Sequence, residues 1–244
     1  MTIPLDAFDA TLARLPILRG LDASERTRLR EAASLLIHHK TFSAVGGANV
    51  DDATQRAIAL QACLLTLNLA EDSYRGWSEI ILYPDEFLRD LEEIDEAGVV
   101  HRSRDILAGE SWHGGPLVLS LADVATSGQA DGVNVVLHEF AHKLDMLNGD
   151  ANGFPPLHRG MDAASWARDF SAAYKDLCAR VDSGEDTAID PYATANPAEF
   201  FAVLTEVFFE TPHLLDMEYP AIYRQLQQFY RQHPLARQEN HEHA

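Results

Sequence analysis

The sequence lacks an apolar run long enough to cross a membrane. The longest candidate, residues 57–70, is shorter than the roughly 18 residues that a span requires and contains Gln61, Thr66 and Asn68. The N-terminal stretch MTIPLDAFDA is acidic and has no basic region followed by an apolar one, so we expect no signal peptide. Both absences favour a globular protein without a membrane span.

Cysteine and positive charge are also scarce. The only two cysteines, Cys63 and Cys178, lie in apolar or helical patterns, which is typical of buried free thiols. Nothing calls for an oxidising compartment, so we expect a cytoplasmic protein. The chain has 19 basic and 38 acidic residues, a formal net charge of −19. Such a surface would repel a phosphate backbone, so direct nucleic-acid binding is not expected.

The N-terminal part of the sequence reads as helical. Helices are expected at 21–40 and 54–70, because apolar residues recur there at helical spacing, and the second helix is the more apolar. Asp22 or Ser24 would cap the first helix. The segment 43–54, which is rich in glycine and aspartate, reads as a loop between them.

From about residue 76 the pattern changes. Short strands are expected at 78–84, 98–103 and 115–124. Further helices are expected at 162–182, 197–210 and 219–232. A few strands followed by a long helix and more helices predict an α+β fold. We place a helical part at 1–75, packed on a core at 76–244 or continuous with it, and we expect the polar C-terminal tail to be frayed.

The stretch VVLHEFAHKLDMLNG carries the clearest chemical pattern. His138 and His142 are four residues apart on an expected helix that ends at Asn148-Gly149, so both imidazoles lie on one face and can reach one ion. Zinc accepts histidine nitrogens, and Glu139 between them is placed to touch a metal-bound water. Two neighbouring surface histidines are the alternative, but the flanking residues are apolar rather than a polar stripe.

A third metal ligand is needed, and three carboxylates are candidates. Glu199 stands in the stretch NPAE, where it could equally complete a capping box with Asn196. Glu206 lies almost on the same helix face as Glu199, although a solvated residue is the simpler interpretation. Asp145 lies on the face of His142 and is better explained as a hydrogen-bond partner of a ligating histidine.

Two stretches, HEFAHKLD and DPYATANPAEFFAVLTEVFF, resemble the MtfA family, named for Mlc titration factor A. Further stretches that match in the same order are LPILRGLDASERTRLREAASLLIHHK, ILYPDEF and GESWHGGPLVLS. The resemblance covers most of the chain. It implies a soluble bacterial zinc metallopeptidase whose catalytic core is similar to that of the lethal-factor protease, which would make 76–244 a zincin-like catalytic domain.

The resemblance also implies roles for individual residues. His138, His142 and Glu199 would be the zinc ligands, Glu139 the general base, and Tyr192, seven residues before Glu199, the active-site tyrosine. The substrate would be a peptide, with aminopeptidase activity on short substrates as the suggested form. The segment PLVLS could be an edge strand that pairs with an extended peptide, or equally an internal strand.

Two other functions are compatible with these residues. One is a zinc hydrolase of non-peptide bonds. The other is a regulatory protein that captures a sugar-responsive transcriptional repressor, as the family name implies, with the zinc site gating or vestigial. The presence of Glu139 favours catalysis, because zinc binding alone needs only the ligands.

Overall fold

The structure is a computed structural model that describes residues 2–70, 73–84, 87–94, 100–107, 109–111 and 114–242. In chain order, its helices and strands are α1 (Leu5–Leu12), η1 (Pro16–Leu18), α2 (Ala23–His39), β1 (Thr41–Ala44), α3 (Asp52–Thr66), β2 (Glu79–Tyr83), β3 (Phe87–Ile94), β4 (Val100–Leu107), β5 (Gly109–Ser111), β6 (Leu117–Ser120), α4 (Leu121–Thr126), α5 (Val135–Asp145), η2 (Met146–Asn148), α6 (Ala163–Asp182), η3 (Pro191–Thr194), α7 (Pro197–Glu210), α8 (Pro212–Glu218), α9 (Pro220–Tyr230) and α10 (Pro234–Glu242).

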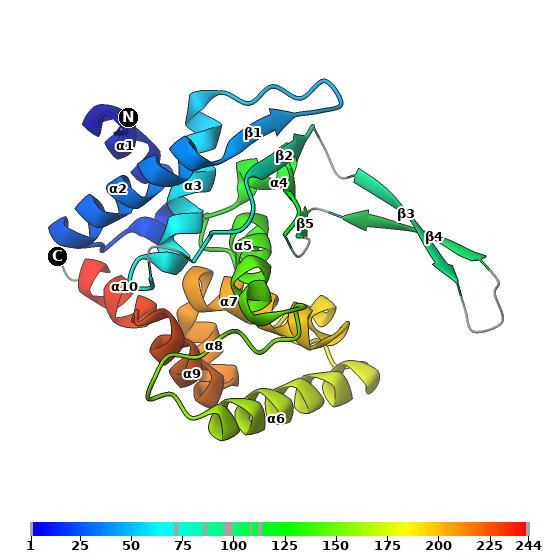
Figure 1. Ribbon diagram of the computed structural model, residues 1–244. Coiled ribbons are helices and arrows are strands. Elements are labelled where there is room, and N and C mark those ends of the chain that lie inside the picture. The colour runs from blue at the N-terminus through cyan, green and yellow to red at the C-terminus, as the bar shows by residue number, and fades with distance from the viewer. Residues whose placement is uncertain are drawn as a thin grey trace.

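The main sheet has the strand order β1-β2-β6-β5 (Figure 1). β1, β2 and β6 are parallel, and β5 is antiparallel to β6. Ile80, Leu82, Leu117 and Leu119 are fully buried, as expected for parallel strands covered by helices. β6 is therefore an internal strand, and the edge position that we considered for PLVLS belongs to β5.

The N-terminal helices are close to the prediction. α2 begins with a capping box in which Asp22 accepts the N–H of Glu25 at 2.8 Å and Glu25 accepts the N–H of Asp22 at 3.0 Å. The prediction of a loop at 43–54 is wrong at both ends of the segment. Residues 43 and 44 belong to β1, which pairs with β2, and α3 already begins at Asp52. The short strand was missed because half of it is polar and its partner is distant in the sequence.

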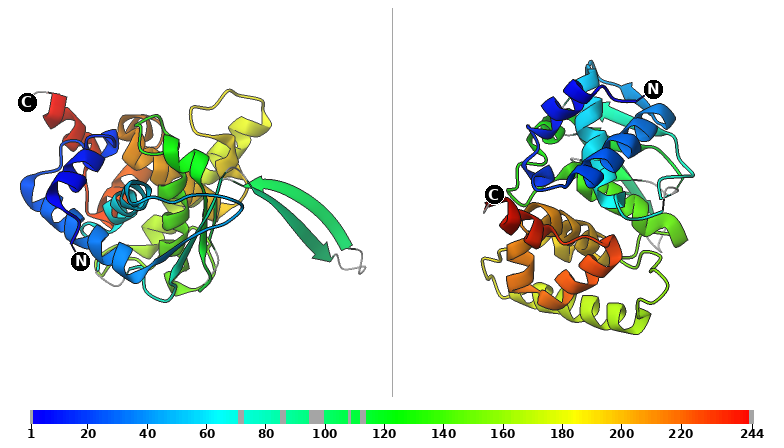
Figure 2. Two further views of the ribbon diagram at one scale, coloured as in Figure 1. Left: turned by 90° about the horizontal axis from the view of Figure 1, so that it is seen from above. Right: turned by 90° about the vertical axis from the view of Figure 1, so that its left-hand side faces the viewer.

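The remaining strands needed larger corrections. β3 and β4 form an antiparallel ribbon that projects from the body (Figures 1 and 2). Residues 100–103 of the strand expected at 98–103 belong to β4, which continues to Leu107, while 98 and 99 lie outside the described residues. β3 was not predicted. The strand expected at 115–124 ends at Ser120, whose hydroxyl accepts the N–H of Asp123 and caps α4.

α5 and α7 lie between the sheet with the N-terminal helices and the helices α6, α8 and α9 (Figures 1 and 2). In α7 every residue from Ala198 to Glu210 is buried except Glu199. Burying one phenylalanine contributes about 1.5–3 kcal/mol, and α7 buries four. This packing holds the helix firmly, so a carboxylate on it has a defined position.

One cluster of buried hydrophobic side chains extends from Ile3 to Tyr230. The α+β fold class is confirmed, and the boundary near residue 75 stays a prediction. The expected fraying of the tail is wrong for the residues described up to 242, because α10 contacts α8 and the buried Arg237 donates to Gln232 at 2.9 Å. Both cysteines are free thiols, as predicted, with Cys63 fully buried and Cys178 partly so.

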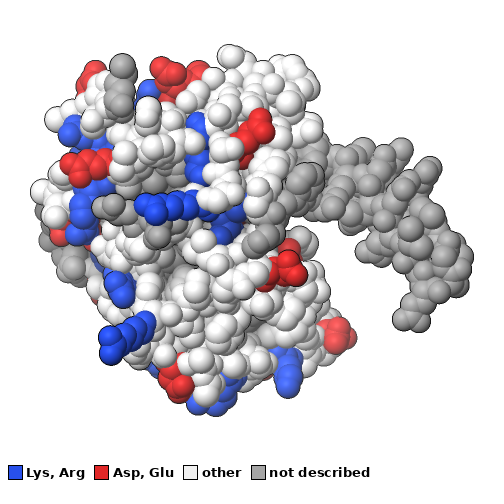
Figure 3. Space-filling model, in the orientation of Figure 1, with Lys and Arg blue, Asp and Glu red and all other residues white. Residues whose placement is uncertain are grey.

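Among the described residues, no helix is both long and apolar enough to span a membrane. On the face seen in Figure 3, Lys and Arg side chains are interspersed with Asp and Glu, so the acidic excess is not gathered there. The cytoplasmic location stays a prediction.

Candidate metal centre

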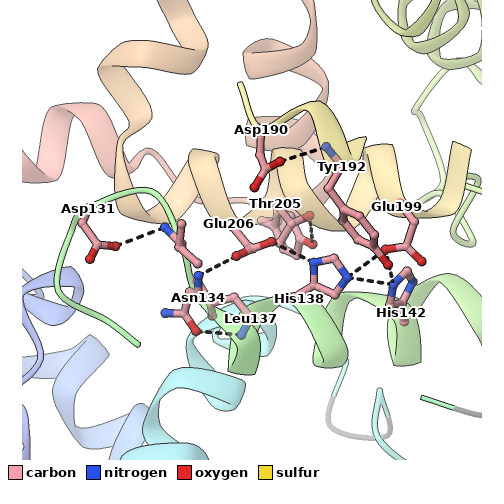
Figure 4. A network of polar contacts seen from close by, with 12 residues as sticks. Asp131, Asn134, Leu137, His138, His142, Asp190, Tyr192, Glu199, Thr205 and Glu206 are labelled. Carbon is pink, nitrogen blue, oxygen red and sulfur yellow. Dashed lines mark hydrogen bonds and ion pairs between the residues drawn. The ribbon is translucent and has the colours of Figure 1, made fainter. Parts of the chain in front are cut away.

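The start of α5 positions the two histidines. Asn134 is the N-cap, and its side-chain oxygen accepts the N–H of Leu137 at 2.9 Å. From this fixed start, His138 and His142 follow one turn apart with ring centroids 4.8 Å apart and Nε2 atoms 3.1 Å apart. Both rings point toward α7 (Figure 4). Every residue of α5 other than His138 is buried, so the helix cannot rotate this face away.

The start of α7 positions Glu199 opposite them. The Asn196 side chain accepts the N–H groups of Ala198 at 2.9 Å and Glu199 at 3.0 Å, and Pro197 takes the first helical position. The Glu199 carboxylate points to the histidines instead of back to Asn196. Its Oε2 lies 2.9 Å from His138 Nε2 and 3.3 Å from His142 Nε2. Asn196 is therefore a cap, as predicted, and the carboxylate of Glu199 is available for a ligand.

These three side chains fit a metal ion. One donor atom from each of His138, His142 and Glu199 lies within 4.8 Å of the other two. Two imidazole nitrogens and one carboxylate oxygen are a donor set that catalytic zinc sites use, with a fourth position open. The side chains retain 9–17% exposure, so the group is shielded but still reachable from solvent.

The negative charge of Glu199 suits a cation. Burial alone would raise the pKa of Glu199, but hydrogen bonds from His138 and His142 hold it far below its usual value. The Glu199 carboxylate is therefore ionised at neutral pH, the form in which it ligates a metal. Burial alone would lower the pKa of His138, but hydrogen bonds to Glu199 and Glu206 raise it well above its usual value.

Glu139 and Tyr192 lie beside the three donors. Glu139 follows His138 on α5, is only 4% exposed, and its charge acts on both His138 and Lys143. Tyr192 stands in η3 and is 49% exposed, with its ring centroid 6.1 Å from that of His138. Asp190 caps η3 by accepting the Tyr192 N–H at 2.8 Å. Figure 4 shows the Tyr192 ring on the Glu199 side of the histidines.

The other two carboxylates have different positions from those expected. Glu206 is not solvated: it is 6% exposed, and its Oε1 lies 2.7 Å from His138 Nδ1. Asp145 is fully buried, and its Oδ2 accepts the N–H groups of Asn152 and Gly153, both at 2.7 Å. Asp145 thus anchors a loop, and the expectation that it is the hydrogen-bond partner of a ligating histidine is wrong. Glu206 has that role instead, as the partner of His138.

Sequence reasoning missed the polar group behind the site. Asn134 donates its amide to Gln61 at 2.8 Å and to Glu210 at 2.6 Å, all three fully buried or nearly so. A signal was available, since Glu206 and Glu210 interrupt the almost wholly apolar stretch FFAVLTEVFFE. A helix that is apolar on all sides is buried, and buried carboxylates have partners.

Lys143 was missed as well. Its Nζ donates to the carbonyl oxygen of Gly115 at 2.9 Å, which ties α5 to the turn before β6. Burial lowers the pKa of Lys143 to about 8.

The α+β fold places a His-Glu-x-x-His helix opposite a carboxylate, a group of donors that could hold a metal ion, and comparison with known families gives the class of protein as a metallopeptidase. Residues 1–231 match the family described as glucose-regulated metallo-peptidase M90, and the chain belongs to this family. The family implies a metal ion, for which the His138, His142 and Glu199 group is suited.

Several curated relatives have the name Mlc titration factor A. The chain is 39% identical to the protein of that name from Escherichia fergusonii over 93% of this chain and 86% of the relative. It is 41% identical to those of Salmonella arizonae and Salmonella gallinarum over 94% of this chain, covering 92% and 87% of the relatives.

Proposed function

We propose that this protein is a zinc-dependent metallopeptidase in which His138, His142 and Glu199 hold the metal. The observation that carries the proposal is the convergence of these three donors beside Glu139, on two helices fixed by caps and by burial. Zinc is proposed over magnesium or calcium because the set contains two imidazoles, which zinc prefers and the harder cations avoid. Family membership supports a peptidase.

The reaction assigns a separate task to each remaining residue. When bound, zinc would act as a Lewis acid that acidifies a water molecule and polarises the scissile carbonyl. Glu139 would accept the proton of the attacking water and return it to the leaving amine, since it follows His138 on α5 and its charge acts on that ring. Tyr192 donates its phenol hydrogen to the carbonyl oxygen as negative charge develops there.

The substrate that we propose is an extended peptide. β5 is at the edge of the sheet and contacts α5, so a peptide paired with β5 would run past the histidines. Aminopeptidase action on short peptides is the form that we propose from the resemblance. Fluorogenic peptides with free and with acetylated N-termini test it, since an aminopeptidase cleaves only the free form.

The decisive experiment is the Glu139→Gln variant. The amide is nearly isosteric with the carboxylate but cannot accept the proton of water at neutral pH, so the variant should retain zinc and lose peptide hydrolysis. Zinc content and thermal unfolding serve as controls for an intact site. Turnover at the wild-type rate in the zinc-loaded variant would contradict Glu139 as the base and with it this mechanism.

A second function is proposed from the name of the relatives, which points to a partner called Mlc. We propose that this chain also binds a transcriptional repressor, with the zinc site gating that binding or vestigial. Calorimetric titration of a purified repressor of this type into wild-type, Glu139→Gln and zinc-depleted protein tests it. Binding only with zinc indicates gating, equal binding in all three indicates an independent surface, and no binding refutes the proposal.

A further inference from the structure

We propose that Glu206 is the positioning residue that determines which nitrogen of His138 faces the metal. The inference rests on the metal site in the proposed function, but not on its peptidase activity. It starts from a direct contact, because Glu206 Oε1 lies 2.7 Å from His138 Nδ1 on the side of the ring opposite Glu199 (Figure 4).

The contact determines the tautomer of His138. An ionised carboxylate only accepts hydrogen bonds, so the Nδ1 atom that faces Glu206 must carry a hydrogen. A ring that binds a metal ion must be neutral, and with the hydrogen on Nδ1 its lone pair is then on Nε2, the nitrogen that lies 2.9 Å from Glu199 and 3.1 Å from His142 Nε2. Glu206 therefore directs the metal-binding lone pair into the group of three donors.

One helix carries both carboxylates that act on His138. Glu199 and Glu206 are seven residues apart on α7, which at roughly 100° per residue leaves them about 20° from the same angular position. Glu199 thus contributes an oxygen that can bind the metal. Two turns later on the same helix, Glu206 orients the ring of His138, which contributes a nitrogen from α5. Both contacts depend on the same register between α5 and α7.

The second oxygen of Glu206 connects the site to the start of α5. Its Oε2 accepts the backbone N–H of Asn134, the N-cap of that helix. The Asn134 amide is in turn held by Gln61 and Glu210. Because Glu206 is only 6% exposed, water cannot readily replace either bond, and the carboxylate cannot turn away from His138 without freeing the cap.

Glu210 offers a matched control on the same helix. It lies one turn after Glu206, is 1% exposed, and contacts Asn134 but no histidine. Two of the donors that face it, the Asn134 amide and the Gly128 N–H, use the single atom Oε1. The amide oxygen of a Glu210→Gln variant can accept both. In a Glu206→Gln variant, by contrast, one of the two facing N–H donors meets an NH₂ group.

The test measures zinc affinity by competition with a chromogenic chelator, using Zn²⁺ alone and the full-length chain. Loss of an outer hydrogen-bond partner of a metal ligand typically lowers metal affinity by about 10–100-fold, and we expect this for Glu206→Gln. We expect Glu210→Gln to stay close to wild type. Equal zinc affinity in wild type and Glu206→Gln, or an equal loss in both variants, would overturn the inference.

A second measurement needs no variant. ¹⁵N chemical shifts of the imidazole nitrogens in zinc-loaded wild-type protein should show His138 with hydrogen on Nδ1 and metal on Nε2. Metal on Nδ1, or no protonated Nδ1, would overturn the inference even if Glu206→Gln fails to fold. A wild-type protein that binds zinc but cleaves no peptide would refute the peptidase proposal alone and leave the role of Glu206 intact.

Discussion

Gly153 packs so closely against Pro197 that a Cβ atom on Gly153 would lie 2.4 Å from the Pro197 carbonyl oxygen. Its own N–H is bound by Asp145 Oδ2 at 2.7 Å, and its carbonyl oxygen accepts the Trp166 indole N–H at 3.2 Å. The loop after α5 is thus held against the first turn of α7, two residues before Glu199. Asp145 links the helix of the histidines to the helix of the glutamate through this contact.

Gly153→Ala should therefore weaken both the fold and the metal site. Its φ is +76°, and overpacking typically costs about 1–3 kcal/mol in addition to the strain of a left-handed residue. Gly160→Ala is the control, since Gly160 also has a positive φ, +101°, but has open space around the Cβ position. Chemical denaturation should show a larger loss of unfolding free energy for Gly153→Ala than for Gly160→Ala. Competition with a chelator should show weaker zinc binding only for Gly153→Ala. Equal losses in both variants would mean that the contact with Pro197 is unimportant.

Glu199→Ala should abolish stoichiometric zinc binding. The variant keeps the Asn196 cap but removes one of three converging donors, so the loss of affinity should exceed the roughly 10–100-fold expected for losing an outer hydrogen-bond partner. Metal analysis after gel filtration measures it, with helical circular dichroism as the check on folding. Unchanged zinc content would show that Glu199 is not a ligand and would direct attention to Glu206.

Tyr192→Phe should lower turnover while leaving zinc content and the Michaelis constant nearly unchanged. A phenol that stabilises the developing oxyanion acts mainly in the transition state, and loss of one such donor typically costs about 10²–10³ in kcat. The half-exposed Tyr192 ring makes large structural damage unexpected. An effect confined to the Michaelis constant would make Tyr192 a substrate contact, and no effect on either constant would exclude it from the reaction.

Glu210 should make stability depend on pH. Burial raises its pKa to about 7 from an ordinary 4.5. Since the pKa is higher in the folded state, the protonated carboxyl contributes stability that is complete below pH 4.5 and lost as pH rises through 7. The shift corresponds to roughly 3 kcal/mol.

The Glu210→Gln side chain cannot ionise, so a comparison of this variant with wild type isolates the effect of the Glu210 charge on stability. The unfolding free energy of the variant, relative to wild type, should rise between pH 4.5 and pH 8 by up to roughly 3 kcal/mol. Urea denaturation at several pH values across this range measures the difference. A difference that does not change with pH would mean that the Glu210 carboxyl titrates as in the unfolded chain.

Much of the local structure could be predicted because its causes are local. The one-turn spacing of His138 and His142, the capping role of Asn196 and the cap at Asp22 depend on helix periodicity and on residues a few positions away. β1 and β3 could not be predicted in this way. Each is a strand only because of its partner, and β1 pairs with a strand whose paired residues lie beyond an intervening helix.

The sequence by itself determined that α5 would present two histidines and a glutamate on one buried helix, and that NPAE would begin another. Only the tertiary structure decided what the carboxylates of α7 do. Glu199 meets His138 across 61 positions of sequence and Glu206 meets it across 68, and helix periodicity specifies only that these two glutamates share a face. The packing of the apolar residues of α7 against α5 turned that face toward the histidines, which made one glutamate a metal-ligand candidate and buried the other behind the ring.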